Sequence, residues 1–305
     1  MEAADIAGAW TAATLRATTP LLFALLGETL VQRTAIINLG VEGQMLVGAF
    51  AGFAAASVFG DPWIALLVGG MAGLLLSSVH AGLCLGAGAN QIGSGIAIWL
   101  LGLGISSFYG RPFVGAEIVG FGPLVANPAT GFRFVDQLLS QLTITTVIAL
   151  ALVPFIGVWL FRSRFGLNWR AVGESIDTAQ ALGLRPWLIQ LQAILVGGFL
   201  AGIGGAVLSV DYTETWAQEI TKGRGLVAVA LVIAARWNPF LALPVALLFG
   251  GSEAAVLRFQ AQGVEISSYL LAATPYVICI LLMWIGYLRV RGNGYMPAEL
   301  SRIFR

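Results

Sequence analysis

Apolar residues run along most of the chain in long stretches that carry few charges. These stretches lack the sustained alternation of apolar and polar positions that is typical of strands. Each approaches the roughly 20 residues that a helix needs to cross about 30 Å of hydrocarbon, where lipid offers backbone groups no hydrogen-bond partner. The pattern predicts an all-α polytopic membrane protein with about nine transmembrane helices, near residues 12–31, 36–59, 62–85, 90–109, 138–161, 187–210, 221–236, 239–257 and 266–290.

The composition supports a single transmembrane domain over residues 1–305. Hydrophobic residues make up 58% of the chain and charged residues 10%, whereas soluble domains carry about 25% charged residues. The net charge of +1 gives no sign of nucleic-acid binding. The N-terminal sequence MEAADIAGAW lacks the basic region of a signal peptide, so the first span is expected to act as its own insertion signal.

The distribution of basic residues predicts the orientation in the membrane. Nine spans place the two termini on opposite sides. If the C-terminus is cytoplasmic, ten of the 16 Lys and Arg residues lie on the inner side and six on the outer side. This excess follows the positive-inside rule. It predicts a multi-pass membrane protein with its N-terminus outside and its C-terminus in the cytoplasm.

A polar island over residues 162–186 separates two long apolar stretches. Val172, Ile176 and Ala179 recur at the spacing of one helical face, and Gly173 and Ser175 are expected to break the island into a turn and a short helix. Arg170, Glu174 and Asp177 supply polar groups around that face. Two interpretations stand side by side: a docking surface for a partner protein, which we favour, and a helix lying at the lipid interface.

Two polar residues, Asn38 and Glu42, lie near the start of the apolar stretch 36–59. A charged side chain in the membrane centre costs about 2.5–3.5 kcal/mol on insertion scales, so Glu42 is expected to face protein or water. One interpretation makes both residues part of a solute path. The other places Glu42 at a helix end at headgroup level, near Arg33.

Three further candidates for a solute path lie in later stretches. Asn90 and Gln91 open the stretch 90–109, where helix capping is the favoured interpretation. Glu253 either lines an outer vestibule or pairs with Arg258 five residues later, and we favour the pair.

Two segments interrupt the regular succession of spans. Residues 110–137 hold three prolines and several glycines, which predict an irregular outer loop. The stretch 221–236 is short and begins with Lys222-Gly223-Arg224-Gly225; short, glycine-interrupted spans mark solute paths in transporters. It matches 36–59 in an inverted repeat, although Lys222 and Arg224 are favoured as interfacial anchors.

The chain offers no catalytic chemistry of its own. It has no phosphate-binding G-x-x-x-x-G-K-[ST] loop and no recognisable serine triad. Its single histidine has no accompanying cysteine and histidine cluster, so no metal site and no bound cofactor are expected. If the protein performs work, another subunit must supply the energy.

Four phrases of the sequence are distinctive: NLGVEGQMLVGAFAG, GANQIGSGIAIWLLGLG, RAVGESIDTAQALGL and GRGLVAVALVIAARWNPFLALPVALLFG. Together they resemble the permease subunits of bacterial ABC importers, in a branch related to the ribose-type and branched-chain amino acid permeases and closest to the nucleoside permeases. The resemblance implies a location in the bacterial inner (plasma) membrane. The resemblance implies that the polar island is a cytoplasmic coupling helix, with Arg170, Val172, Gly173, Glu174, Ile176, Asp177 and Ala179 in contact with an ATPase.

The resemblance also implies a set of partners and a solute. The partners are an ATPase subunit that holds ATP and Mg, a second non-identical permease, an extracytoplasmic substrate-binding protein and membrane lipid. The implied solute is a nucleoside, with a simple sugar, a purine base or a riboflavin-like molecule as alternatives. A stand-alone secondary transporter or channel is the rival from another class, and a membrane enzyme is disfavoured by the missing catalytic residues.

Overall fold

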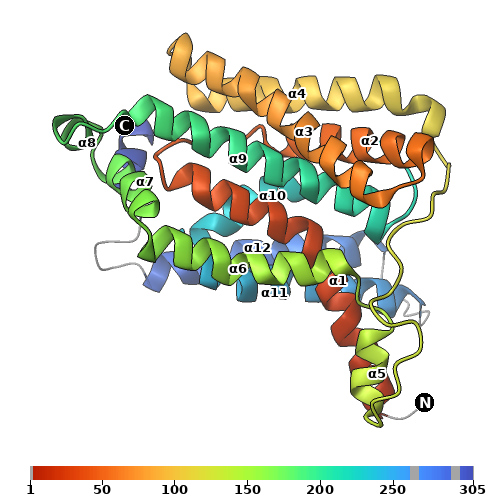
Figure 1. Cartoon of the computed structure of the whole chain (residues 1–305). Helices are drawn as coiled ribbons and strands as arrows, with labels where there is room; N and C mark the ends of the chain where they lie inside the picture. Colours follow the sequence, from red (N-terminus) through yellow and green to blue (C-terminus); the bar gives the residue numbers. More distant parts are fainter. Residues whose placement is uncertain (1–2, 262–267, 290–295, 305) are drawn as a thin grey trace.

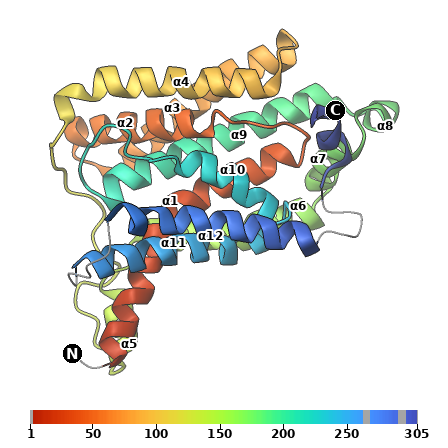
Figure 2. The same ribbon diagram turned by 180° about the vertical axis from the view of Figure 1, so that it is seen from behind.

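The computed structural model describes residues 3–261, 268–289 and 296–304. Long helices run side by side along one common direction (Figure 1), and the reverse view shows the same bundle from behind (Figure 2). Within these residues the only strand-like pairing is one isolated bridge between Glu117 and Thr215. The long helices are α1 (Ala3–Gln32), α2 (Val41–Phe59), α3 (Pro62–Ala81), α4 (Gln91–Gly110), α6 (Ile144–Arg162), α9 (Pro186–Val207), α11 (Pro239–Ala261) and α12 (Ser268–Arg289).

Shorter elements lie between these helices. They are α5 (Arg133–Leu139), α7 (Arg164–Glu174), α8 (Ile176–Ala181) and α10 (Arg224–Ala234), with π-helical turns at Gly82–Gly86 and Leu208–Tyr212 and 3₁₀ turns at Arg111–Phe113 and Ala298–Phe304. The all-helical class predicted from the sequence is therefore confirmed. We call the last of these turns, Ala298–Phe304, the C-terminal turn.

Helix length and composition identify fewer candidate membrane crossings in the described residues than the hydrophobic pattern predicts. Within the described ranges, six helical stretches are long and apolar enough to cross a membrane. The seventh stretch, expected to be short, contains α10, which has 11 residues and is about 16 Å long. The predicted total of nine stays a prediction. The six stretches are Val41–Phe59, Pro62–Gly86, Gln91–Phe113, Ile144–Arg162, Pro186–Tyr212 and Pro239–Ala261.

Close contacts between glycines hold the middle of the bundle together. A Cβ atom on Gly48 of α2 would collide with the backbone of Gly202 in α9, and a Cβ on Gly73 of α3 would collide with the same stretch of α9. Small residues allow helix backbones to approach this closely in membranes, where packing rather than hydrophobic burial drives association. The abundance of glycine in the sequence thus serves helix packing around α9.

Two segments re-enter the bundle without forming a helix. Residues 33–40 follow α1 and are largely buried, and residues 213–223 follow the π-helical turn after α9. Four non-glycine residues in these segments have positive φ angles, between 48° and 64°. Both α2 and α10 therefore begin inside the bundle, and the expected inverted repeat that relates them stays a prediction. The four residues are Ala35, Glu214, Glu219 and Lys222.

The two ends of the bundle differ in character (Figure 1). At one end, which we call the α7 end, lie α7, α8 and the C-terminal turn; at the opposite end, the α5 end, α5 packs beside the first turns of a bent α1. The expectation that 110–137 is wholly irregular is wrong for its last part, because α5 begins at Arg133. The following span begins at Ile144 rather than at 138.

Candidate functional site

The carboxylate of Glu42 lies in the middle of the bundle and is 3% exposed. It accepts hydrogen bonds from the Thr221 hydroxyl at 2.5 Å and from the backbone N–H groups of Gly223 and Gly225 at 2.9 and 2.6 Å. All three donors belong to the start of α10, where backbone N–H groups lack partners within the helix. Glu42 therefore caps α10 from another helix. Its expected place at a helix end is confirmed, since it lies in the first turn of α2, while its level in the membrane stays a prediction.

The residues at the start of α10 alternate in what they face. Thr221, Gly223 and Gly225 donate to Glu42, whereas Lys222 and Arg224 between them line a cavity of about 200 Å³. We call it the α10 cavity. Its other lining residues come from α11 and α12: Phe249, Glu253, Val256, Leu257, Gln260, Pro275 and Tyr276. One short segment thus joins the buried carboxylate to the wall of a cavity.

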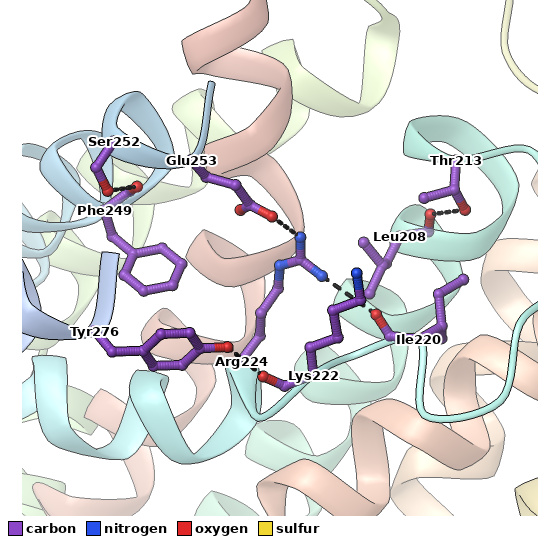
Figure 3. Close-up of polar contacts among 9 residues, drawn as sticks. All are labelled: Leu208, Thr213, Ile220, Lys222, Arg224, Phe249, Ser252, Glu253 and Tyr276. Atoms are coloured by element: carbon purple, nitrogen blue, oxygen red, sulfur yellow. Dashed lines mark hydrogen bonds and ion pairs between the residues drawn. The ribbon is translucent and has the colours of Figure 1, made fainter. Parts of the chain in front are cut away.

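An ion pair crosses the α10 cavity between Arg224 and Glu253 (Figure 3). The side chain of Arg224 is 8% exposed and that of Glu253 is 22% exposed, so water screens the pair only in part. Arg224 also donates to the carbonyl of Ile220 at 3.3 Å. Two predictions are wrong here: Glu253 does not pair with Arg258, and Arg224 is a buried partner rather than an interfacial anchor.

Two aromatic rings form another part of the cavity wall. The rings of Phe249 and Tyr276 meet edge to face, with 6.1 Å between their centroids. The Tyr276 hydroxyl donates to the carbonyl of Lys222 at 2.5 Å, which ties α12 to the start of α10. The cavity therefore combines aromatic surface with a paired cation and anion (Figure 3).

Asn38 belongs to a buried hydrogen-bond network beside α2 rather than to the α10 cavity. Its Nδ2 donates to Gln44 at 3.1 Å, and its backbone N–H donates to Glu28 at 3.3 Å. Gln32 donates to Glu28 at 2.9 Å and accepts from the indole of Trp237 at 2.7 Å. Sequence reasoning missed Glu28, although a carboxylate inside an apolar stretch is itself a signal.

Asn90 and Gln91 hold the start of α4. Asn90 Oδ1 accepts a hydrogen bond from the backbone N–H of Gly93 at 3.0 Å, so the predicted cap is confirmed. Gln91 accepts from the backbone N–H of Ile37 at 2.8 Å and fixes the re-entrant segment 33–40. Neither residue lines the α10 cavity.

A second buried acid, Asp211, escaped the sequence reasoning. Its carboxylate accepts hydrogen bonds from the hydroxyls of Thr143, at 2.8 Å, and Thr145. Arg16 donates to its backbone carbonyl at 2.8 Å. These contacts connect the end of α9 with α1 and the start of α6. An acid at the end of an apolar stretch was the available signal, but its partners lie 66 or more residues away.

The α7 end carries a cationic hollow of about 450 Å³ lined by Arg33, Arg170, Glu174 and Arg236 among others. The guanidinium groups of Arg33 and Arg170 lie 5.6 and 5.5 Å from the centroid of the Phe161 ring. Burial lowers the pKa of Arg33 to about 10, against the opposing effect of Glu174. Arg33 remains protonated at neutral pH, so the hollow keeps its positive charge.

The residues of the predicted coupling segment divide into two groups. Glu174 and Asp177 are exposed and Arg170 is partly exposed, as docking to a partner requires. Val172, Gly173 and Ala179 are buried within the chain, and their predicted contact with an ATPase stays a prediction. A Cβ on Gly173 would collide with the carbonyl of Arg33 and lie 3.3 Å from Pro297.

The helix break predicted near Ser175 is confirmed. Ser175 ends α7 and caps α8, since its hydroxyl accepts a hydrogen bond from the backbone N–H of Thr178 at 3.2 Å. The neighbouring Ile176 is partly buried, and its N–H donates to Glu299 in the C-terminal turn. The C-terminal turn thus holds the first residue of α8.

Comparison with known proteins gives a consistent picture. A family model described as the permease component of branched-chain amino acid transport systems matches residues 11–285. The chain is 40% identical over 252 residues to a putative glucose ABC transporter permease protein of Haloferax volcanii, covering 81% of this chain and 77% of the relative.

Two further relatives are named for nucleosides. Identity is 33% over 285 residues with a nucleoside ABC transporter permease protein of Lactococcus lactis subsp. cremoris, covering 87% of this chain and 88% of the relative. It is 30% over 292 residues with a guanosine ABC transporter permease protein of Bacillus subtilis, covering 89% of each. No solved structure matches the chain.

Proposed function

The chain belongs to the family of branched-chain amino acid transport system permease components, and from this premise we propose that it moves a nucleoside across the membrane. It is a permease subunit of an ABC transporter. The observation that carries the solute proposal is the α10 cavity, where a paired Arg224 and Glu253 lie beside the rings of Phe249 and Tyr276.

The cavity chemistry favours an uncharged solute with a ring and several hydroxyl groups. The exposed ring of Tyr276, backed by the buried ring of Phe249, offers packing surface to a base. Arg224 and Glu253 offer a hydrogen-bond donor and acceptor to its polar groups. The volume of about 200 Å³ is below the ~300–1,000 Å³ of typical ligand pockets. We therefore assign the rest of the site to the second, non-identical permease subunit.

A glucose-type sugar is the second candidate solute. It is supported by the 40% identity to a relative named as a putative glucose permease. The same cavity suits a sugar, because Arg224 and Glu253 can bind hydroxyl groups while an aromatic ring packs against the apolar face of the sugar. The two candidates therefore differ in whether a base is required for transport.

The α7 end is proposed to be the cytoplasmic face, where an ATPase subunit holding ATP and Mg docks. Exposed Glu174 and Asp177 and partly exposed Arg170 give that subunit polar contacts. Arg33, beside Arg170 across the Phe161 ring, donates to the carbonyl of Trp237 at 2.7 Å, just after α10. This chain of contacts supports a route by which movement of α7 reaches the start of α10 and its cavity.

The proposed orientation places the C-terminus in the cytoplasm and the N-terminus outside. The α5 end then meets an extracytoplasmic binding protein that delivers the solute. ATP-driven closure of the ATPase would shift α7 and α8, and the bundle would alternate between outward and inward openings. This chain supplies the solute path and the surface on which the ATPase docks. Its partners supply the energy and bind the solute outside the membrane.

Uptake by the purified complex tests the proposal. The complex, isolated through a tag on this chain with its ATPase, second permease and binding protein, is placed in liposomes. Labelled guanosine, uridine and glucose are supplied with and without internal ATP. ATP-dependent guanosine or uridine uptake that excess glucose leaves unchanged supports the nucleoside. Glucose uptake that nucleosides leave unchanged supports the second candidate, and equal uptake without ATP overturns the transporter class.

A further inference from the structure

The helices α2 and α10 both begin inside the bundle, and the first turn of each lies at Glu42. Glu42 is the second residue of α2, in its first turn. Its carboxylate also binds the N–H of Gly223, which precedes α10, and the N–H of Gly225 within the first turn of α10. One carboxylate therefore lies at two helix N-termini and accepts hydrogen bonds at that of α10.

The charges at this junction balance. A helix N-terminus behaves as roughly +0.5 of an elementary charge, so two of them present about +1 to their surroundings. An ionised carboxylate carries −1. Such N-termini inside transporters commonly face an anionic group of the solute. Here Glu42 already occupies that place, 3% exposed and bound by three donors.

We propose that Glu42 is a built-in counter-anion for the N-termini of α2 and α10, so that the α10 cavity in front of them takes an uncharged polar solute. The inference rests on the proposed solute path through the cavity. Without Glu42, the helix ends would add their field to that of Lys222, on the other side of the same backbone segment, where Glu253 already balances Arg224. The cavity would then favour anions such as phosphorylated nucleosides or sugars.

Charge-selective thiol reagents test the field in the cavity without requiring transport. The reporter is Gln260→Cys, because Gln260 is exposed and lines the cavity, in a chain with Cys84→Ala and Cys279→Ala. The purified complex is treated with an anionic sulfonatoethyl and a cationic trimethylammonioethyl methanethiosulfonate of similar size. The measured quantity is the ratio of their two rate constants, anionic over cationic.

Glu42→Gln should raise this ratio about tenfold, since unscreened charges in clefts change encounter rates by an order of magnitude or more. Glu42→Asp keeps the charge and should leave the ratio within about twofold of its starting value. Glu219→Gln removes the same charge at an exposed position of the neighbouring segment and is the matched control. An unchanged ratio in Glu42→Gln, or an equal rise in Glu219→Gln, overturns the proposal.

A second measurement keeps Glu42 in place, in case Glu42→Gln does not fold. In the Gln260→Cys chain, Lys222→Gln removes one positive charge from the cavity wall. The remaining charges of the wall, on Arg224 and Glu253, then cancel each other. The ratio should then match that of free cysteine within about threefold, and an anionic excess of about tenfold or more overturns the inference. Because these rates do not depend on uptake, failure here is separate from failure of the nucleoside proposal.

Discussion

Glu299 accepts a hydrogen bond at 3.3 Å from the backbone N–H of Ile176, the first residue of α8. This contact joins two segments that are 123 residues apart in the chain. The C-terminal turn therefore holds the start of α8 within the predicted coupling segment. Leu300, 2% exposed, belongs to the same hydrophobic core as Trp169 of α7.

Glu299→Ala should loosen α8. The change removes an acceptor from a helix start, a loss that typically costs about 0.5–2 kcal/mol. Amide hydrogen exchange over residues 176–181 should become faster, and ATP-driven uptake should fall while the protein still inserts. Ser301→Ala is the matched control, because the Ser301 hydroxyl donates only to the carbonyl of Ala298 in its own turn. Equal exchange in both variants would contradict the supporting role.

Replacing both Arg170 and Glu174 with alanine should uncouple uptake from ATP hydrolysis. These residues lie on α7 beside the cationic hollow, and we propose that they contact the ATPase. Uptake in liposomes should drop at least about tenfold, the equivalent of a 1.4 kcal/mol loss of coupling, while hydrolysis continues. Normal uptake by the inserted double variant would refute docking at this surface.

The sequence predicted the helix break at Ser175 and the helix cap at Asn90 because the causes of both are local. Ser175 interrupts the helix through its own backbone and caps the next one within three residues. Asn90 likewise caps α4 through Gly93. The long apolar stretches predicted helices for a similar reason, since every helical hydrogen bond lies within its own stretch.

Contacts between distant segments could not be predicted in the same way. Arg258 is close to Glu253 in sequence, yet Glu253 pairs with Arg224, 29 residues earlier. The donors to Glu42 lie 179 to 183 residues away. Packing of whole helices decides which side chains meet, and a single sequence carries no direct record of it. Burial of Val172 inside the chain has the same origin.

The ion pair of Arg224 and Glu253 should show strong coupling between its two members. Removing one partner leaves a buried charge uncompensated, which costs about 3–5 kcal/mol. Arg224→Ala and Glu253→Ala should each lower the thermal midpoint of unfolding sharply. The midpoint of the double variant should fall by less than the sum of the two single decreases. Arg258→Ala, the partner expected from sequence spacing, is the matched control and should change the midpoint little. Additive losses would contradict the pair.

Two glycine substitutions should affect stability in opposite directions. A Cβ on Gly225 would lie 2.5 Å from the backbone nitrogen and Cα of Glu42, so the start of α10 would have to shift. Gly104 in α4 has open space around a Cβ. Gly225→Ala should therefore destabilise the protein by about 1–3 kcal/mol, as overpacking does.

Gly104→Ala should instead stabilise the protein by up to about 1 kcal/mol, because alanine favours the helix more than glycine does. Both midpoints are measured by thermal unfolding in detergent. The Gly225→Ala variant should also lose uptake, since its shift moves Lys222 and Arg224 in the cavity wall. If Gly225→Ala unfolds at the same temperature as Gly104→Ala and transports normally, the close contact between Gly225 and Glu42 is absent. The start of α10 would then not be held against α2, and Glu42 would have to find its hydrogen-bond donors elsewhere.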